Sequence, residues 1–257
     1  MTVRWIEGFE ARIHHTWQVE TYGQDGTGGY SGAAMVSNVT GRKVGKALAA
    51  NAASLFTTPK LVASPTDTWI IQFAWNKTED TAVSGAPGFR LFRQASGEQL
   101  EIRVVTGVRS GCWALEVFRG AVSLGKTQDY PWGGPRTWMV FQIAVVIHTS
   151  AGSVNIKAWD INNASSTALN LTGINTADQG VNGMDQVQFA PASTSGATHR
   201  IDDIVIMDDA GSVNNAQTSV PFLVYGQLPL DDGPTTDWFP STGSAHYLLL
   251  DEPSTSV

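Results

Sequence analysis

The chain has 257 residues, a formal net charge of -7 and only 15% charged residues. One all-β sandwich can use most of this length, since such domains reach roughly 200–250 residues. The acidic balance argues against nucleic acid as the main partner, because that affinity comes largely from clustered lysine and arginine. With Cys112 as its single cysteine, the chain has no internal disulfide.

We expect neither a secretion signal nor a membrane-spanning segment in this sequence. The first residues, Met1 to Trp5, lack a basic region followed by an apolar run, so we expect no Sec-type signal peptide. The most apolar stretch, 138–147, is about ten residues long, and a membrane span needs roughly 20. We therefore expect synthesis in the cytoplasm and no membrane insertion.

The first strong pattern is an alternation of large apolar residues. Trp69, Ile71, Phe73 and Trp75 alternate with Ile70, Gln72, Ala74 and Asn76, which places the four large side chains on one face of a strand. This period of two predicts a core strand with those four side chains facing the interior.

Further strands are expected on both sides of short turns rich in glycine, serine or alanine. Residues 88–93 and 100–104 predict a hairpin around the turn 95–98, and Trp113, Leu115 and Val117 predict the next strand, which ends at a turn at Gly120. The chain therefore reads as antiparallel and all-β.

The second half adds three elements. Residues 138–148 are apolar at nearly every position, which predicts a strand covered on both faces, and 154–160 returns after a small-residue turn. The polar stretch 160–183 is interpreted as a loop at the edge of the sandwich. Residues 199–209 predict a late core strand that ends in an acidic turn.

Three short motifs occur in a characteristic order. They are Glu7-Gly8-Phe9-Glu10 near the start, Ile201-Asp202-Asp203-Ile204 in the late strand, and a tail with Asp232-Gly233, Trp238, Pro240, Tyr247 and Asp251-Glu252. In this the chain resembles a group of bacteriophage and prophage virion structural proteins with a concanavalin A-like, laminin-G-like jelly roll. The resemblance implies an antiparallel β-sandwich followed by an irregular C-terminal extension.

The extension is expected to be a docking segment. We divide the chain into a jelly-roll sandwich, 1–227, and an irregular C-terminal segment, 228–257. Prolines at 229, 234 and 240 interrupt any continuous strand ladder. The segment nevertheless carries Trp238, Phe239 and Tyr247, which are costly to leave in water. We expect these three to contact the sandwich or a neighbouring subunit during assembly.

The acidic residues do not form a catalytic pattern. Retaining glucanases of this sandwich fold place their carboxylates on alternate positions of one strand, so that two of them face one groove about 5–5.5 Å apart. Glu98 and Glu101 are three residues apart, which predicts opposite strand faces, and the same holds for Glu7 and Glu10. We expect no catalytic residues and no enzyme.

A calcium site is the alternative to a protein without cofactors. Calcium prefers oxygen ligands, and aspartates expected in loops include Asp178, Asp185, Asp208, Asp209, Asp231 and Asp232. We interpret these mainly as turn formers. In the late strand, Asp202 or Asp203 is expected to bind backbone groups or to pair with Arg200.

Carbohydrate recognition would use aromatic rings that stack on sugars. Trp132 is the first candidate, because proline and glycine on both sides predict a loop, and Tyr130, Trp159 and Tyr30 follow. The structural alternative for Trp132 is an anchor of its own loop or a contact between protomers.

These observations favour a non-enzymatic virion component, in a tail, fibre or head-decoration role. Its expected partners are other virion proteins, further copies of itself in a homo-oligomer, and a host-surface polysaccharide bound for adsorption. The alternatives are a polysaccharide-cleaving enzyme, either glycosidase or lyase, on the same fold, and a free bacterial lectin-like module.

Overall fold

The computed structural model describes part of the chain. The described residues are 2–7, 29–31, 42, 47–50, 55–58, 60–77, 86–93, 95–108, 112–131, 138–159, 165–189, 199–210, 216–221 and 224. All regular elements among them are β-strands. Within these ranges no helix has the length and apolar character needed to cross a membrane.

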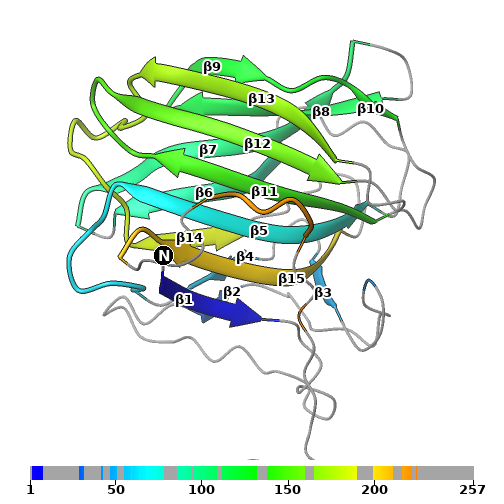
Figure 1. Ribbon diagram of the computed structural model, residues 1–257, viewed down its shortest axis with the longest axis horizontal. Helices are drawn as coiled ribbons and strands as arrows, with labels where there is room; N and C mark the ends of the chain where they lie inside the picture. The colour runs from blue at the N-terminus through cyan, green and yellow to red at the C-terminus, as the bar shows by residue number, and fades with distance from the viewer. Residues whose placement is uncertain are drawn as a thin grey trace, which may run out of the picture.

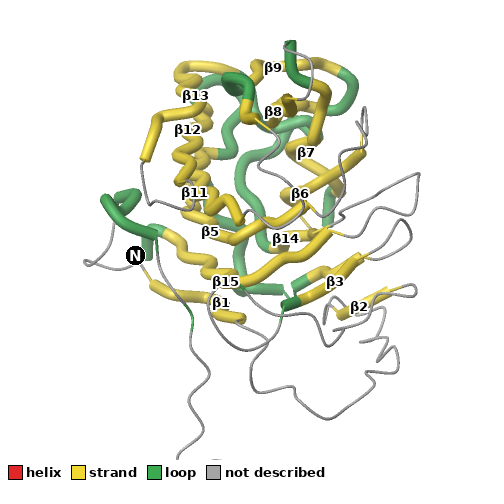
Figure 2. Tube along the Cα trace, turned by 90° about the vertical axis from the view of Figure 1, so that its right-hand side faces the viewer, coloured by secondary structure: helices red, strands yellow, loops and turns green. Residues whose placement is uncertain are grey.

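The strands form two antiparallel sheets that face each other as layers (Figures 1 and 2). The seven-stranded sheet has the order β1 (Thr2–Glu7), β15 (His199–Asp208), β5 (Thr68–Lys77), β11 (Trp138–Val146), β12 (Gly152–Trp159) and β13 (Ser165–Ile174), with β3 (Leu48–Ala50) beside β15. The eight-stranded sheet has the order β10 (Tyr130–Pro131), β8 (Cys112–Arg119), β7 (Gly97–Thr106), β6 (Ala86–Arg93), β14 (Gln186–Phe189), β4 (Leu55–Thr57) and β2 (Gly29–Ser31), with β9 (Val122–Lys126) beside β8. The prediction of an all-β antiparallel sandwich is confirmed.

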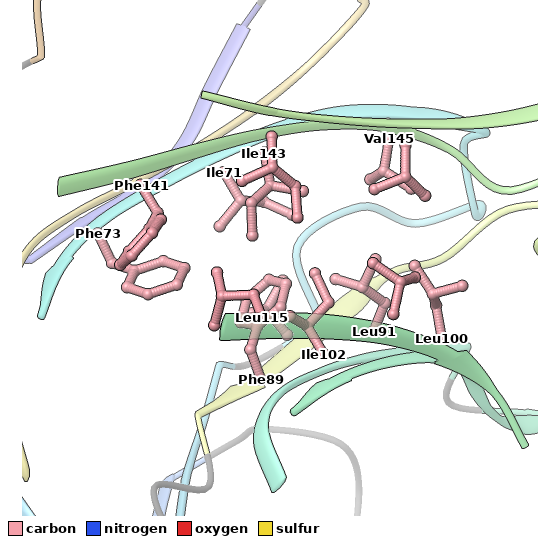
Figure 3. Packing of buried hydrophobic residues seen from close by; sticks show 14 of the residues in the cluster. Ile71, Phe73, Phe89, Leu91, Leu100, Ile102, Leu115, Phe141, Ile143 and Val145 are labelled. Carbon is pink, nitrogen blue, oxygen red and sulfur yellow. The ribbon is translucent and has the colours of Figure 1, made fainter. Parts of the chain in front are cut away.

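The core lies between the two sheets and is centred on β5. Trp69, Ile71, Phe73 and Trp75 all point into it and are at most 5% exposed, as the alternation predicted. Figure 3 shows Ile71, Phe73 and the side chains of β11 meeting those of β6, β7 and β8 from the opposite sheet. Phe73 lies at the centre, with ring centroids of Phe89 and Phe189 at 5.5 and 5.4 Å. It therefore joins the sheets through aromatic contacts that add to the burial of its own surface.

Truncating Phe73 tests this packing. Phe73→Ala should lower the free energy of unfolding by about 3–5 kcal/mol, because it removes a buried ring and leaves a cavity between the sheets. Urea denaturation gives the value, with Val122→Ala, at an exposed position, as control. An unchanged midpoint for Phe73→Ala would contradict the assignment of Phe73 to the core.

The central part of the outer face of the seven-stranded sheet is also covered. Residues 216–221 and 224, here called the C-terminal strap, cross this face and are seen in orange over β5 and β11 in Figure 1. Gln142 of β11, fully buried, exchanges two hydrogen bonds with Thr218: it accepts from the backbone N–H at 2.8 Å and donates to the hydroxyl at 3.0 Å. The indole N–H of Trp159 donates to the carbonyl of Ser219 at 3.4 Å.

A β-bulge in β15 holds the far end of the strap. Asp203 has a positive φ of 51°, and the pairing of β15 with β5 shifts by one residue there, so Ile201 and Ile204 both face the core. The bulge keeps the Asp203 carboxylate out of the core, where its oxygens accept from the backbone N–H of Val224 and from Nε of Arg42. Asp202 accepts from the backbone N–H of Arg42 at 2.8 Å.

The Asp202–Asp203 pair thus ties three distant parts of the chain together. The expected bonds to backbone groups are present, but the ion-pair partner is Arg42 and not Arg200. Burial raises the pKa of Asp203 above its ordinary value, although the Val224 N–H and the Arg42 guanidinium act to lower it. Sequence spacing suggested Arg200 because it is near in the chain, whereas the bulge turns the carboxylate toward Arg42.

The strap yields a second prediction. Gln142→Ala should lower the free energy of unfolding by about 1–3 kcal/mol, because it leaves polar groups of the strap without their partner at a buried position. Urea denaturation measures the loss, and hydrogen exchange should show faster exchange at the Thr218 amide. Thr172→Ala, a change at an exposed position of β13, should alter neither the free energy of unfolding nor the exchange rate of the Thr218 amide.

One predicted loop contains a strand instead. Within the stretch 160–183, residues 165–174 form β13, the outermost strand of its sheet. The prediction was wrong there because an edge strand buries little surface, so serine, threonine and asparagine are tolerated. Ala168, Leu169 and Leu171 supply its contacts with the core.

Candidate functional site

The outer face of the eight-stranded sheet carries a row of polar and aromatic side chains. Cross-strand pairing makes neighbours of Thr57 on β4, Gln188 on β14, Arg90 on β6, Glu101 on β7 and Phe118 on β8. These five residues, together with Arg103, are here called the outer row. Their strand neighbours, such as Leu91 and Ile102, face the core, so alternation turns the row outward.

Hydrogen bonds connect the outer row from strand to strand. Gln188 donates to the hydroxyl of Thr57 at 3.0 Å and accepts from Nη1 of Arg90 at 3.4 Å. Arg90 Nε donates to Glu101 Oε1 at 3.1 Å. Since neighbouring strands lie about 4.8 Å apart, five strands extend the row over about 19 Å. This length suits an extended chain molecule better than a single small ligand.

Glu101 is the fixed point of the row. Its side chain is 3% exposed, and its second oxygen accepts from Nε of Arg103 at 2.7 Å and also pairs with Nη2 of that arginine. The Arg103 guanidinium in turn lies 4.2 Å from the centroid of the Phe118 ring. One buried carboxylate therefore orients two arginines, each of which keeps about 30% of its side chain exposed.

A β-bulge brings Glu98 to the same face as Glu101. Leu100 pairs with Leu91 while Glu98 pairs with Phe92, so Gln99 is an extra residue in β7. The prediction that Glu98 and Glu101 lie on opposite faces was wrong for this reason, because one inserted residue reverses the alternation. Both carboxylates contact Nε of Arg90, Glu98 at 3.3 Å and Glu101 at 3.1 Å.

The pKa of Glu98 is raised. Burial is the largest cause and the neighbouring Glu101 adds to it, with a smaller contribution from Asp178, while Arg90 and Arg103 act to lower it. Glu98 is only partly exposed, and its 3.3 Å contact is long for a charge-assisted bond, whose usual range is about 2.7–2.9 Å. The protonated form of Glu98 is therefore stabilised in the folded protein relative to the unfolded chain.

This pKa shift makes the stability depend on pH. A raised folded-state pKa means that Glu98 stabilises the fold below its ordinary value of 4.5, and that this contribution is lost as the pH rises through the raised value. Glu98→Gln should flatten the dependence of unfolding free energy on pH across that weakly acidic window. Urea denaturation at a series of pH values measures it, with Asp209→Asn at an exposed carboxylate as control. Equal slopes for wild type and Glu98→Gln would refute the assignment.

The aromatic residues predicted to bind carbohydrate are not gathered in one place. Tyr30 lies on β2 and Tyr130 on β10, at opposite ends of the eight-stranded sheet. Trp159 belongs to the other sheet and is 1% exposed, so its ring is covered and does not suit stacking on a sugar. Trp132 lies outside the described residues.

The predicted metal-binding aspartates are likewise dispersed. Asp208 ends β15, is fully buried and accepts from the backbone N–H of Ala210 at 3.1 Å, as a turn former does. Asp209 is exposed, and buried Asp185 lies 3.7 Å from Nζ of Lys60. Among the described residues no three histidine, cysteine or acidic side chains gather as a metal site would require. Asp231 and Asp232, and the assembly candidates Trp238, Phe239 and Tyr247, lie outside those residues.

Sequence reasoning missed the outer row, although part of the signal was present. In the predicted hairpin, Arg90 alternates with Phe89 and Leu91, and Arg103 with Ile102 and Val104. That pattern assigns the arginines to the outward face. What the sequence could not supply was the pairing of β6 with β14, which lies almost a hundred residues later and brings Gln188 to Arg90.

Comparisons with known proteins return structural likenesses only. No family model matches the chain, and no curated protein matches it. Among solved structures, the cellulose-induced protein Cip1 aligns with a TM-score of 0.48 at 14% identity, covering 79% of this chain and 96% of its own. The alginate lyase vAL-1 from Chlorella virus gives 0.47 at 9% identity, covering 71% and 93%. A seed lectin of Lotus tetragonolobus gives 0.46 at 11% identity, covering 72% and 94%.

Proposed function

We propose that this chain is a non-enzymatic glycan-binding sandwich that serves as a structural component of a phage virion. The observation that carries glycan binding is the outer row, a connected line of guanidinium, carboxylate, amide and hydroxyl groups that crosses five strands. Sugars present many hydroxyl groups that need donors and acceptors in fixed positions. A row already ordered by its own hydrogen bonds loses little side-chain entropy on binding.

The virion role rests on the three sequence motifs and on the predicted docking segment, 228–257. In this proposal the sandwich presents the outer row to a host-surface polysaccharide, and the C-terminal segment attaches the chain to other virion proteins and to further copies of itself. The C-terminal strap supports this division of roles, because residues 216–221 and 224 lie on the seven-stranded sheet, on the side of the sandwich opposite the outer row.

Glycan binding is tested with the purified chain on an array of bacterial surface polysaccharides. Gln188→Ala should lower the affinity for the bound glycan by about fivefold to tenfold, since it removes an amide that a sugar hydroxyl would contact. Asn170→Ala removes an exposed amide from the other sheet and should leave the affinity unchanged. Equal effects of the two variants would place the binding surface elsewhere. The virion role is tested by electron microscopy with a gold-labelled antibody, and unlabelled particles would refute it.

Polysaccharide cleavage is the second candidate function. The observation that favours it is the placement of Glu98 and Glu101 on one face, with the pKa of Glu98 raised as a general acid requires. Against it, Glu101 is 3% exposed and its oxygens are engaged by two arginines, so it is poorly placed to attack a sugar or to activate water. Cleavage would be established if the wild-type chain released reducing ends or unsaturated products from the bound glycan and Glu98→Gln did not.

A further inference from the structure

Two arginine nitrogens of the outer row have unused hydrogen-bonding capacity. Arg90 uses Nε for the glutamates and Nη1 for Gln188, while Arg103 uses Nε and Nη2 for Glu101. Within the described part of the chain, Nη2 of Arg90 and Nη1 of Arg103 donate no hydrogen bond. Both side chains are about 30% exposed, so part of each arginine is accessible from solvent.

The two guanidinium groups are held in fixed positions. Glu101 binds Arg90 through one oxygen and Arg103 through the other, and the Phe118 ring supports Arg103 from a second side. Arginine side chains normally lose considerable rotamer entropy when they bind a ligand, and this arrangement removes part of that cost in advance. Two guanidinium groups that one buried carboxylate holds in order are suited to bind a further anionic group, and especially a carboxylate.

Glu98 already places a carboxylate against one member of this pair, Arg90. It contacts Nε of Arg90 at 3.3 Å and is only partly buried, so it is a weakly held internal anion. We propose that Arg90 and Arg103 form a clamp for the carboxylate of an acidic glycan built from uronic acid units, with Glu98 occupying part of the clamp until the ligand arrives. This inference rests on the proposed glycan-binding function and names the class of glycan.

Charge balance predicts how the clamp responds to pH. The charged groups that act on Glu98 are Glu101, Arg90, Arg103 and Asp178. A bound uronate adds a further negative charge next to Glu98, which favours its protonated form. Binding therefore takes up a proton, and affinity for a uronate should rise as the pH falls from neutral toward weakly acidic values.

The experiment compares matched ligands on the full chain by isothermal titration calorimetry. The probes are oligogalacturonate and oligomannuronate of defined length, and the same oligosaccharides with their carboxyl groups methyl-esterified. The wild-type chain should bind at least one free acid roughly tenfold more tightly than its ester, because each charge-assisted hydrogen bond contributes about 1.5–3 kcal/mol.

Variants assign this difference to the clamp. Arg103→Gln should remove most of the preference for the free acid, while Arg119→Gln makes the same change of charge outside the outer row and should preserve it. Arg103→Lys keeps the positive charge that pairs with Glu101 but lacks the planar guanidinium. Its preference for the free acid over the ester should therefore lie between those of Arg103→Gln and Arg119→Gln. Glu98→Gln should bind the uronate more tightly at neutral pH and lose the pH dependence. Thermal melting checks that each variant is folded.

The outcomes separate this inference from the proposed function. Equal affinity for acid and ester, or a preference that survives Arg103→Gln, overturns the clamp while leaving glycan binding intact. Binding of neutral polysaccharides alone would also overturn the clamp and leave glycan binding intact. Absence of binding to every glycan on the array overturns both proposals.

Discussion

Packing around Phe73 is the contact on which the rest of the structure depends. Its ring touches aromatic rings of β6 and β14 in the opposite sheet and of β11 in its own. Because the inner faces of both sheets are committed to this core, the polar side chains that alternate with core residues on these strands face outward. The outer row, and the sheet surface on which the C-terminal strap lies, both follow from this one buried layer.

The two outer faces then differ in what covers them. On the seven-stranded sheet, Ile70, Gln72, Val140 and Gln142 are at most 2% exposed, and the strap satisfies Gln142 through hydrogen bonds. On the eight-stranded sheet, Arg90 and Arg103 remain partly exposed. The two outer faces of the sandwich are therefore not equivalent, because the strap covers the central strands of the seven-stranded sheet.

Two β-bulges place the charged groups that matter most. In β15 the bulge removes Asp203 from the core and offers its carboxylate to Arg42 and Val224. In β7 the extra residue Gln99 turns Glu98 toward Arg90. Each bulge interrupts the regular hydrogen bonding between strands, and each positions a carboxylate whose pKa is raised. Asp203 holds other parts of the chain, whereas Glu98 makes only a long contact with Arg90.

The sequence by itself determined the strands with the strongest apolar patterns and the inner faces of those strands. Alternation in 69–75 predicted the four core residues of β5, and the nearly continuous apolar run from Trp138 predicted a strand covered on both faces, because burial of one or both faces leaves a direct trace in residue order. Only the tertiary structure decided the register and the partners across strands. The pairing of Arg90 with Gln188, the bulge at Gln99 and the contact of Arg42 with Asp203 join residues far apart in the chain or shift alternation by one residue. The local residue pattern predicts neither the contacts between distant residues nor the one-residue shifts, because both are selected by the energy of packing the two complete sheets together.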